Sequence, residues 1–539
     1  MRPGPGARGP APCDRGSGGA GNGPAPIPRV RFQTLPSDCN IFPPAPPAPA
    51  ASSLPMRAAN VYNRGMRYDC IIIGAGLSGL AAGIRLAMFD KRVVILEKHV
   101  EIGGLNSFYT RKHRRFDVGL HAMTNFTPKG ARGGPLARLL KQLRFRHEEF
   151  RLCEQGFSEI RFPGRRLRFS NQFGLLEEDI AAAFPGQIDG FRRLVRRVQE
   201  FDELNLDDAT RLSARAVAGE CLSDPVLIDM LFCPLMYYGS ASEGDMDFYQ
   251  FVIMFKSIYM EGFAKPEGGM FFILNLLKER FLSLGGELRL GAPVKTLHAR
   301  NGTLAAVELA DGETLSAGRV LSSAGYLETL RLCRPPLAAA ETHPPGRMSF
   351  MESIFVLDRE PRELGFEPSI VFFCTEPRFR YRVPEELVDV TSGVLCLPNN
   401  FRYPRPLPEG MIRLTHQANY DLWDGLARSD YRAAKKRERE RALDALGGFF
   451  PDFRQNVVYI DSFTPKTIFK YTGHLNGAVY GSPQKIKNGV TPLNNLFICG
   501  TDQGFLGIIG ATLSGISMAN RHVLKAESSR IQQTGELNA

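Results

Sequence analysis

The sequence lacks the patterns that mark disulfide-bonded, zinc-binding or membrane-spanning proteins. Its ten cysteines are scattered from Cys13 to Cys499, with no C-x-x-C pair and no cluster of histidine and cysteine. They are therefore interpreted as reduced thiols, and no metal site is predicted. No stretch approaches the roughly 18 consecutive apolar residues that a membrane-spanning helix needs. Ser-His-Asp, H-E-x-x-H and P-loop patterns are also missing, so the common hydrolase and nucleotidase mechanisms are not indicated.

Net positive charge is small outside the N-terminal segment. Residues 1–67 carry eight arginines and two aspartates, so +6 of the formal net charge of +11 lies there and the rest of the chain carries only +5. Bulk charge therefore gives little reason to expect a nucleic-acid partner. An arginine-rich hairpin, predicted to turn at Pro163 and Gly164, is either a solvated sheet face or a basic surface facing anionic lipid.

Residues 1–66 are rich in glycine, proline and alanine and lack the apolar core of a secretory signal. Three interpretations remain open. The segment is a disordered tail, or translation begins at Met66, or the arginines belong to an organellar transit peptide. Residues 528–539 are expected to form a flexible C-terminal tail.

A dinucleotide-binding motif follows directly. The apolar run 70–73 predicts a buried strand, and Gly74, Gly76 and Gly79 have the spacing G-x-G-x-x-G before a helix with an apolar stripe. Val93–Leu96 predicts the second strand, and Glu97 is placed to accept hydrogen bonds from a ribose diol. The helix N-terminus supplies free amides to a diphosphate. The cofactor-binding candidates in this stretch are Gly74, Gly76, Leu77, Ser78, Gly79, Glu97 and Lys98.

A second glycine-rich junction lies near the end of the chain. A strand at 495–499 enters a turn through Gly500 and Asp502, and a helix follows the glycines around Gly510. This junction brings a second helix N-terminus to a cofactor, and Asp502 is expected to meet a ribityl hydroxyl or a diphosphate-bridging water. A dehydrogenase that uses only a nicotinamide cofactor has no need of this remote element, so FAD is favoured over NAD.

Together with the pair Gly103-Gly104 and the stretch Phe116-Asp117-Val118-Gly119, these motifs resemble flavin enzymes of the phytoene desaturase type. That group includes carotenoid desaturases, carotenoid isomerases and retinol saturases, and is related more distantly to monoamine oxidases. The resemblance covers nearly everything after Met66. It implies FAD as cofactor, Gly103 and Gly104 beside the dinucleotide, and Val294 at the adenine end. Many carotenoid desaturases lack the Gly-x-Asp at 500–502, which leaves the direction of the redox chemistry open.

The expected fold class is α/β, with a Rossmann-type FAD-binding domain built from discontinuous segments and an inserted α+β substrate domain. A chain of 539 residues is long enough for two or more domains. The FAD-binding segments are expected at 67–135, 266–330 and 456–527, and the substrate-domain segments at 136–265 and 331–455.

The predicted function is the desaturation, saturation or isomerisation of C=C bonds in a carotenoid, retinoid or other polyisoprenoid. His121 is the candidate acid or base nearest to the flavin motifs, although a structural role beside Asp117 is the alternative. The expected partners are an apolar small molecule, an external electron acceptor or donor (quinone, oxygen or NAD(P)H) and a membrane surface. A cytoplasmic location is predicted, with peripheral membrane association or organellar targeting also open. The alternatives are an amine or protoporphyrinogen oxidase of the same superfamily, or a flavin-binding protein without turnover.

Overall fold

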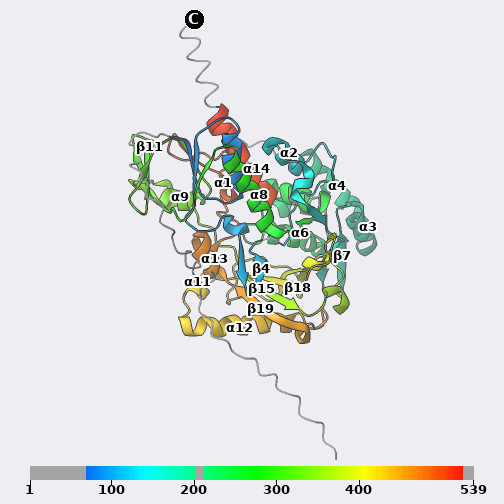
Figure 1. Ribbon diagram of the computed structural model, residues 1–539. Coiled ribbons are helices and arrows are strands. Elements are labelled where there is room, and N and C mark those ends of the chain that lie inside the picture. Colours follow the sequence, from blue (N-terminus) through cyan, green and yellow to red (C-terminus); the bar gives the residue numbers. More distant parts are fainter. Residues whose placement is uncertain (1–67, 120, 202–210, 526–539) are drawn as a thin grey trace, which may run out of the picture. The chain divides into compact units, whose positions relative to one another are not determined.

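The computed structural model describes residues 68–119, 121–201 and 211–525 (Figure 1). All of them belong to a single compact unit. The predictions for residues 1–66 and 528–539 concern segments that lie outside the described residues.

A five-stranded parallel sheet forms the centre of the dinucleotide-binding part. Its strand order is β20-β13-β1-β2-β9, and every neighbouring pair runs parallel. Parallel strands are buried on both faces, which explains the uninterrupted apolar runs in the sequence. The strands are β1 (Tyr68–Ile73), β2 (Val93–Leu96), β9 (Glu287–Arg289), β13 (Ala317–Ser322) and β20 (Leu496–Ile498).

Two layers cover this sheet. Successive residues of a strand point to opposite faces, so Cys70 and Ile72 pack against helices while Ile71 and Ile73 pack against a second, four-stranded sheet. The helices are α1 (Leu77–Ala87), α2 (Pro135–Leu143), α8 (Gly269–Ser283) and α14 (Gly507–Ala519). The second sheet has the order β12-β11-β10-β14, with strands β10 (Val294–Arg300), β11 (Thr303–Leu309), β12 (Thr314–Leu315) and β14 (Cys333–Arg334).

A seven-stranded sheet forms the other major part. Its order is β19-β15-β18-β17-β16-β6-β7. Neighbouring strands are antiparallel, except that β16 and β6 run parallel. The predicted arginine-rich hairpin is present as β6 and β7. The strands are β6 (Ser158–Phe162), β7 (Arg165–Phe169), β15 (Ser349–Leu357), β16 (Ile370–Cys374), β17 (Ser392–Cys396), β18 (Gly410–Ala418) and β19 (Val457–Phe463).

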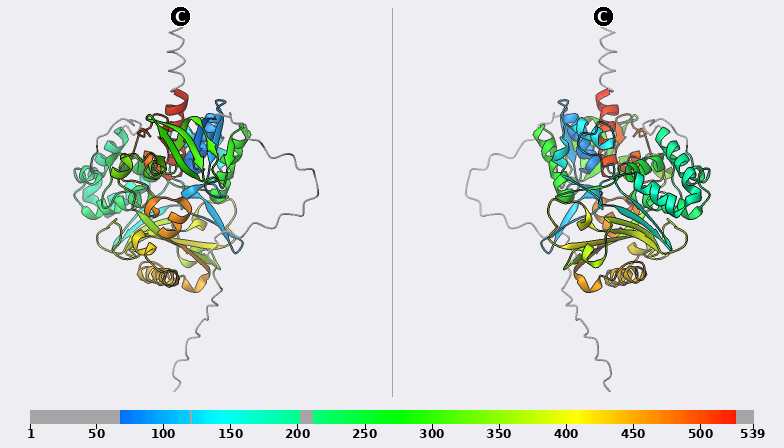
Figure 2. Two further views of the ribbon diagram at one scale, coloured as in Figure 1. Left: turned by 90° about the vertical axis from the view of Figure 1, so that its left-hand side faces the viewer. Right: turned by 90° about the vertical axis from the view of Figure 1, so that its right-hand side faces the viewer.

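Helices cover both faces of this sheet. Phe372 of β16 packs with the aromatic helices α6 (Pro225–Gly239) and α7 (Phe248–Phe255). Phe373 faces the opposite side, where α12 (Arg428–Ala445) contributes Ala442 and Leu443. In both views of Figure 2, α12 lies at the end of the unit away from α14. The remaining helices of this part include α3 (Gly174–Ala183), α4 (Ile188–Glu200), α5 (Ala214–Gly219), α11 (Tyr420–Asp424) and α13 (Pro465–Thr472).

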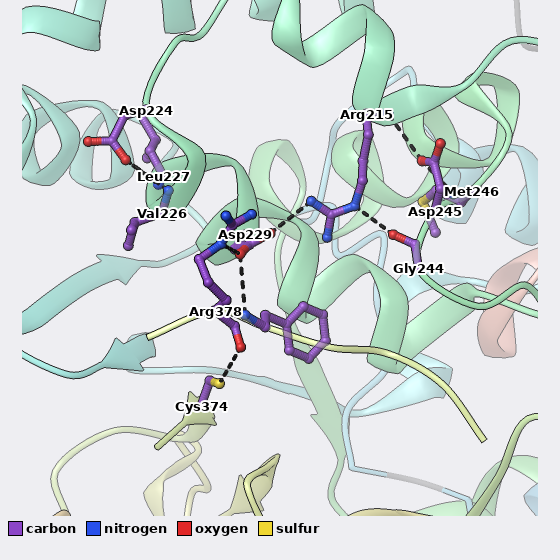
Figure 3. A network of polar contacts seen from close by, with 11 residues as sticks. Arg215, Asp224, Val226, Leu227, Asp229, Gly244, Asp245, Met246, Cys374 and Arg378 are labelled. Carbon is purple, nitrogen blue, oxygen red and sulfur yellow. Dashed lines mark hydrogen bonds and ion pairs between the residues drawn. The ribbon is translucent and has the colours of Figure 1, made fainter. Parts of the chain in front are cut away.

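A buried carboxylate fixes helix α6 to its neighbours. Asp229 accepts hydrogen bonds from Arg215 at 2.8 Å and from Arg378 at 2.6 Å, and Arg215 also donates to the carbonyl of Gly244 (Figure 3). The Asp229 side chain is 1 % exposed, so both guanidinium groups are needed to offset its desolvation. These bonds hold α6, which carries Tyr237 and Tyr238 toward the cavity described below.

Two elements near the expected segment boundaries pack across those boundaries. Helix α2, in the segment expected for the substrate domain, places Leu136, Leu139 and Leu143 in the same core as α1 and α14. Strand β19, in the segment expected for the FAD-binding domain, pairs with β15 in the seven-stranded sheet. Tertiary packing selects the partner of an amphipathic helix or an edge strand, and local sequence pattern does not encode it. In the described part of the chain, no helix combines the length and apolarity needed to cross a bilayer.

Candidate active site

The first glycine turn joins β1 to α1. Gly74 has φ of +94°, in the left-handed region that favours glycine. A methyl group on Gly79 would collide with the carbonyl oxygen of Gly74, so helix and strand pack together only with glycine there. At Gly76, by contrast, an added Cβ would meet no atom within 4 Å. The turn therefore has a tightly packed inner side and an open outer side at Gly76.

Two helix N-termini without a side-chain cap lie at this site. Neither α1, whose N-cap is Gly76, nor α14, whose N-cap is Leu506, has a side chain that caps it or an acidic residue in its first turn. Amides and helix dipoles of this kind stabilise an anion. The side chain of Leu77 is buried in the core, so a ligand at this site would meet only its backbone.

The acidic residue at the end of β2 lies beside the same turn. Glu97 is buried and accepts hydrogen bonds from the amides of Ala75 at 2.8 Å and His99 at 2.9 Å. Gly103 donates its amide to the carbonyl of Ala75 at 2.9 Å and forms a bridge with Gly76. Gly104 follows it, and an added Cβ there would lie 3.9 Å from the Cα of Gly76. The Gly103-Gly104 pair thus flanks the open side of the turn.

Two other cofactor-binding candidates, Val294 and Lys98, lie at the margin of the site. Val294 begins β10, two residues after Ala292, whose amide donates to the carbonyl of Glu97 at 2.8 Å. Val294 therefore lies near Glu97. Lys98 extends toward Gly473, where an added Cβ would lie 2.5 Å from its Nζ, so its side chain packs beside the end of α13.

The second glycine turn meets the first. An added Cβ on Gly500 would lie 2.9 Å from the Oγ of Ser78, and one on Gly515 would collide with the carbonyl of Ser78. Helices α1 and α14 therefore pack closely, with α8 alongside (Figure 1). Two junctions that are more than 400 residues apart in sequence form one site. Its open glycine, its two uncapped helix ends and its buried acid fit a dinucleotide with a diphosphate bridge.

Asp502 is held by two backbone amides of other loops. Its two carboxylate oxygens accept hydrogen bonds from the backbone amides of Tyr326, at 2.7 Å, and Ser482, at 2.8 Å. The residue is 3 % exposed. Asp502 thus ties the C-terminal turn to two other loops, and a direct bond to a cofactor would use the remaining lone pairs. Gly510 lies in the first turn of α14, where an added Cβ would contact Phe505.

A cavity of about 150 Å³ lies between the second glycine turn and the seven-stranded sheet. Its walls are mostly apolar or aromatic, and they come from α6, β15, β17, β18 and the start of α14. They include Tyr237, Tyr238, Phe350, Val394, Ile468, Val479, Tyr480, Leu506 and Ile508. The predicted acid or base, His121, lines this cavity beside Tyr480.

One polar cluster interrupts the apolar wall. The Nε2 of His121 lies 3.1 Å from Oε2 of Glu352 and 3.0 Å from Oγ1 of Thr415. Thr415 donates its hydroxyl hydrogen to Glu352, and Arg413 donates to Glu352 at 2.6 Å and to the carbonyl of Val118 at 2.9 Å. The side chains of Glu352 and Arg413 are 4 % and 2 % exposed.

Burial and pairing determine the charges in the cluster. Burial alone would raise the pKa of Glu352, but Arg413 and His121 outweigh it and lower the pKa to about 2. Burial lowers the pKa of His121 more than Glu352 raises it. The cluster therefore contains an ionised glutamate, a charged arginine and a neutral histidine at neutral pH.

Sequence reasoning missed Glu352, Arg413 and Thr415. A partial signal was present, because Glu352 and Arg413 are the charged residues of their strands, β15 and β18. The register pairs Glu352 of β15 directly with Thr415 of β18, which places Arg413 two residues along on the same face. Only the pairing of the two strands brings them to His121.

A protein-family model for flavin-containing amine oxidoreductases matches residues 77–522, most of the chain. The chain belongs to this family. The match begins at the first residue of α1 and includes the second glycine junction. The protein is therefore an FAD-dependent oxidoreductase, with FAD as its cofactor. When bound, FAD accepts or donates a hydride at its isoalloxazine ring.

Several curated proteins are similar in sequence to this chain over most of their length. Prolycopene isomerase 2 from an Oncidium hybrid cultivar is 23% identical over 84% of this chain and 83% of its own. The lycopene-forming phytoene desaturase of Pseudescherichia vulneris is 26% identical over 73% of this chain and 85% of its own. All-trans-retinol 13,14-reductase of Danio rerio is 22% identical over 84% and 86%.

Solved structures agree with the family fold. An oxidoreductase from Methanosarcina mazei has a TM-score of 0.60 at 19% identity, covering 83% of this chain and 99% of its own. A putrescine oxidase variant has a TM-score of 0.58 at 16% identity, covering 85% and 99%. The α/β architecture expected from the sequence is therefore confirmed.

Proposed function

We propose that this FAD-dependent oxidoreductase acts on carbon–carbon double bonds of a carotenoid, retinoid or other polyisoprenoid. The observation that carries the proposal is the apolar, aromatic cavity, which opens beside the C-terminal glycine turn where a flavin ring would face it. Polyisoprene chains have methyl-branched, apolar surfaces that such walls bind by excluding water. The names of the curated relatives support the same substrate class.

The residues at each end of the site have separate tasks in this proposal. The first glycine turn, with Gly74, Gly76 and Gly79, and the N-terminus of α14 would hold the diphosphate, and Glu97 would bind the ribose. The cavity walls orient the substrate chain and keep water away from the reacting bond. Its volume of about 150 Å³ suits the segment around one double bond, with the rest of a long chain held elsewhere.

Anaerobic incubation of the purified holoprotein with phytoene, lycopene and retinol, followed by chromatography of the products, tests the proposal. We expect one of these substrates to be converted, with bleaching of the flavin absorbance if it is oxidised. To test saturation, the holoprotein is first reduced and then incubated with the same substrates. Turnover is then compared with quinone, oxygen and NAD(P)H as electron acceptor or donor. The Gly76→Ala variant, expected to lose FAD, is the matched control.

An amine oxidase is the second candidate, since it shares the family and fold. If a panel of amines bleaches the flavin and no isoprenoid is converted, the isoprenoid proposal is wrong. If FAD binds but no substrate changes its spectrum, the alternative of a flavin-binding protein without turnover is favoured.

Contact with a membrane surface belongs to the same proposal, because long isoprenoids partition into bilayers. Three of the four arginines of the β6–β7 hairpin pair with acids, namely Arg161 and Arg166 with Glu159 and Arg168 with Asp179. We therefore expect weak binding to anionic vesicles that is lost above about 0.15 M salt, measured by flotation.

A further inference from the structure

The cluster beside the cavity fixes the hydrogen on His121. Nε2 of His121 faces three oxygens, namely the two carboxylate oxygens of Glu352, at 3.3 and 3.1 Å, and Oγ1 of Thr415, at 3.0 Å. The carboxylate is ionised and can only accept. Thr415 uses its single hydroxyl hydrogen for Glu352, so toward His121 it also accepts. All three partners therefore require that Nε2 carries the hydrogen.

The other ring nitrogen is consequently an acceptor. In a neutral imidazole only one nitrogen carries hydrogen, so Nδ1 of His121 presents a lone pair. Among the described residues it has no hydrogen-bond partner, whereas Nε2 has several. The His121 side chain is 14% exposed and lines the cavity. An acceptor without a partner therefore lies in a largely apolar wall.

The charge of the cluster selects against an ionic ligand. Glu352 and Arg413 form a buried pair at 2.6 Å, and the next titratable pair, Lys265 and Asp117 at 3.6 Å, is also of opposite sign. No net charge is left to attract an ammonium or carboxylate group. A neutral group that donates a hydrogen bond fits this place.

We propose that the substrate carries a hydroxyl group, and that His121 accepts its hydrogen bond through Nδ1 and so selects an apolar alcohol over the corresponding hydrocarbon. This inference rests on the proposed function, because it narrows the isoprenoid class to its alcohols. Glu352 and Thr415 act as positioning residues that keep the acceptor on the cavity side. The remaining wall binds the apolar part of the molecule.

Calorimetric titration of the FAD-loaded protein at pH 8 tests this with three small ligands of one size, benzyl alcohol, toluene and benzaldehyde. A cavity of this volume admits a single aromatic ring. We expect benzyl alcohol to bind about tenfold more tightly than toluene, the gain of one buried hydrogen bond. Benzaldehyde has no donor for His121 and should bind less tightly than benzyl alcohol. Equal affinities for the alcohol and the aldehyde, or no binding by any of the three, would overturn the inference.

Variants sharpen the test. His121→Phe should remove the preference for the alcohol, whereas Ile468→Val, in the same wall, should weaken all three ligands equally and keep their ratio. In Glu352→Gln the amide can donate to Nε2, which moves the ring hydrogen to Nδ1. Benzaldehyde should then gain affinity relative to toluene. A preference that survives His121→Phe would contradict the assignment, and the wild-type titration decides the question even if a variant does not fold.

A second pair of ligands separates this inference from the proposed function. Geraniol and its deoxy hydrocarbon, 2,6-dimethyl-2,6-octadiene, are titrated in the same way. If both isoprenoids bind with one affinity, the hydroxyl inference fails and the isoprenoid proposal stands. If benzyl alcohol binds more tightly than toluene but neither isoprenoid binds, the isoprenoid proposal fails and the hydroxyl inference stands.

Discussion

The two glycine turns and the cavity beside them are built by opposite means. At the turns, the backbone makes the site, and the decisive feature at Gly76 is the lack of a side chain. In the cavity, side chains make the site, and a buried Glu352–Arg413 pair orients one histidine. The first kind of site is specified by residues close in sequence. The second is specified by strand register across 61 residues from Glu352 to Arg413.

This contrast has an energetic side. A glycine turn costs little to maintain, because its amides are satisfied by water until an anion binds. A buried ion pair is different, since each charge has lost its hydration and depends on its partner. Substitutions in the two regions should therefore have different effects. Those at the turn should weaken cofactor binding, and those at the buried ion pair should lower the stability of the protein.

The largest effect is expected for Arg413→Met. The substitution leaves Glu352 buried without its main partner, which destabilises a protein by about 3–5 kcal/mol. Urea denaturation of the FAD-saturated protein measures the loss. Arg347→Met is the matched control, because Arg347 pairs with Asp421 at 2.8 Å on the surface, where both side chains are more than half exposed. It should cost less than about 1 kcal/mol. Equal losses in the two variants would show that the buried pair has no special role.

An intermediate effect is expected for Gly79→Ala. The new methyl group would collide with the carbonyl oxygen of Gly74, and such overpacking costs about 1–3 kcal/mol. Gly76→Ala provides the comparison, since its methyl group would meet no protein atom within 4 Å. Its unfolding free energy should change by less than about 1 kcal/mol, while the FAD content after purification falls sharply. Denaturation of the apoprotein and the ratio of flavin to protein absorbance measure both. A Gly76→Ala protein with full FAD content would contradict the assignment of the open side to the diphosphate.

The same contrast explains how far the sequence could be interpreted. The strand, the glycine spacing and Glu97 fall within about 30 residues, so local rules predict their arrangement. The meeting of Gly500 with Ser78 could also be anticipated, because both turns follow parallel strands of one sheet, and the carboxyl ends of such strands lie at the same edge. The pairing of Glu352 with Thr415 could not, since no local signal sets the register of β15 against β18. The hydrogen bonds that Asp502 accepts could not be predicted either, because they come from loops at Tyr326 and Ser482.

The smallest effect concerns Lys485, which lies where the two regions meet. It donates to the carbonyl of Tyr480 at 2.5 Å, and burial lowers its pKa from 10.5 to about 8, against the opposing attraction of Asp502. The unfolded chain therefore holds this proton up to about pH 10.5 and the folded protein releases it near pH 8. Stability should rise with pH between these values, because the unfolded state binds more protons there. Since the side chain is partly exposed, we expect a contribution of about 1–2 kcal/mol. Lys485→Met should flatten this part of the curve, which is measured by urea denaturation of both proteins from pH 7 to 10.5. If the free energy of unfolding of variant and wild type changes with pH in the same way, Lys485 remains charged in the folded protein. Water would then reach this side chain more than its burial implies.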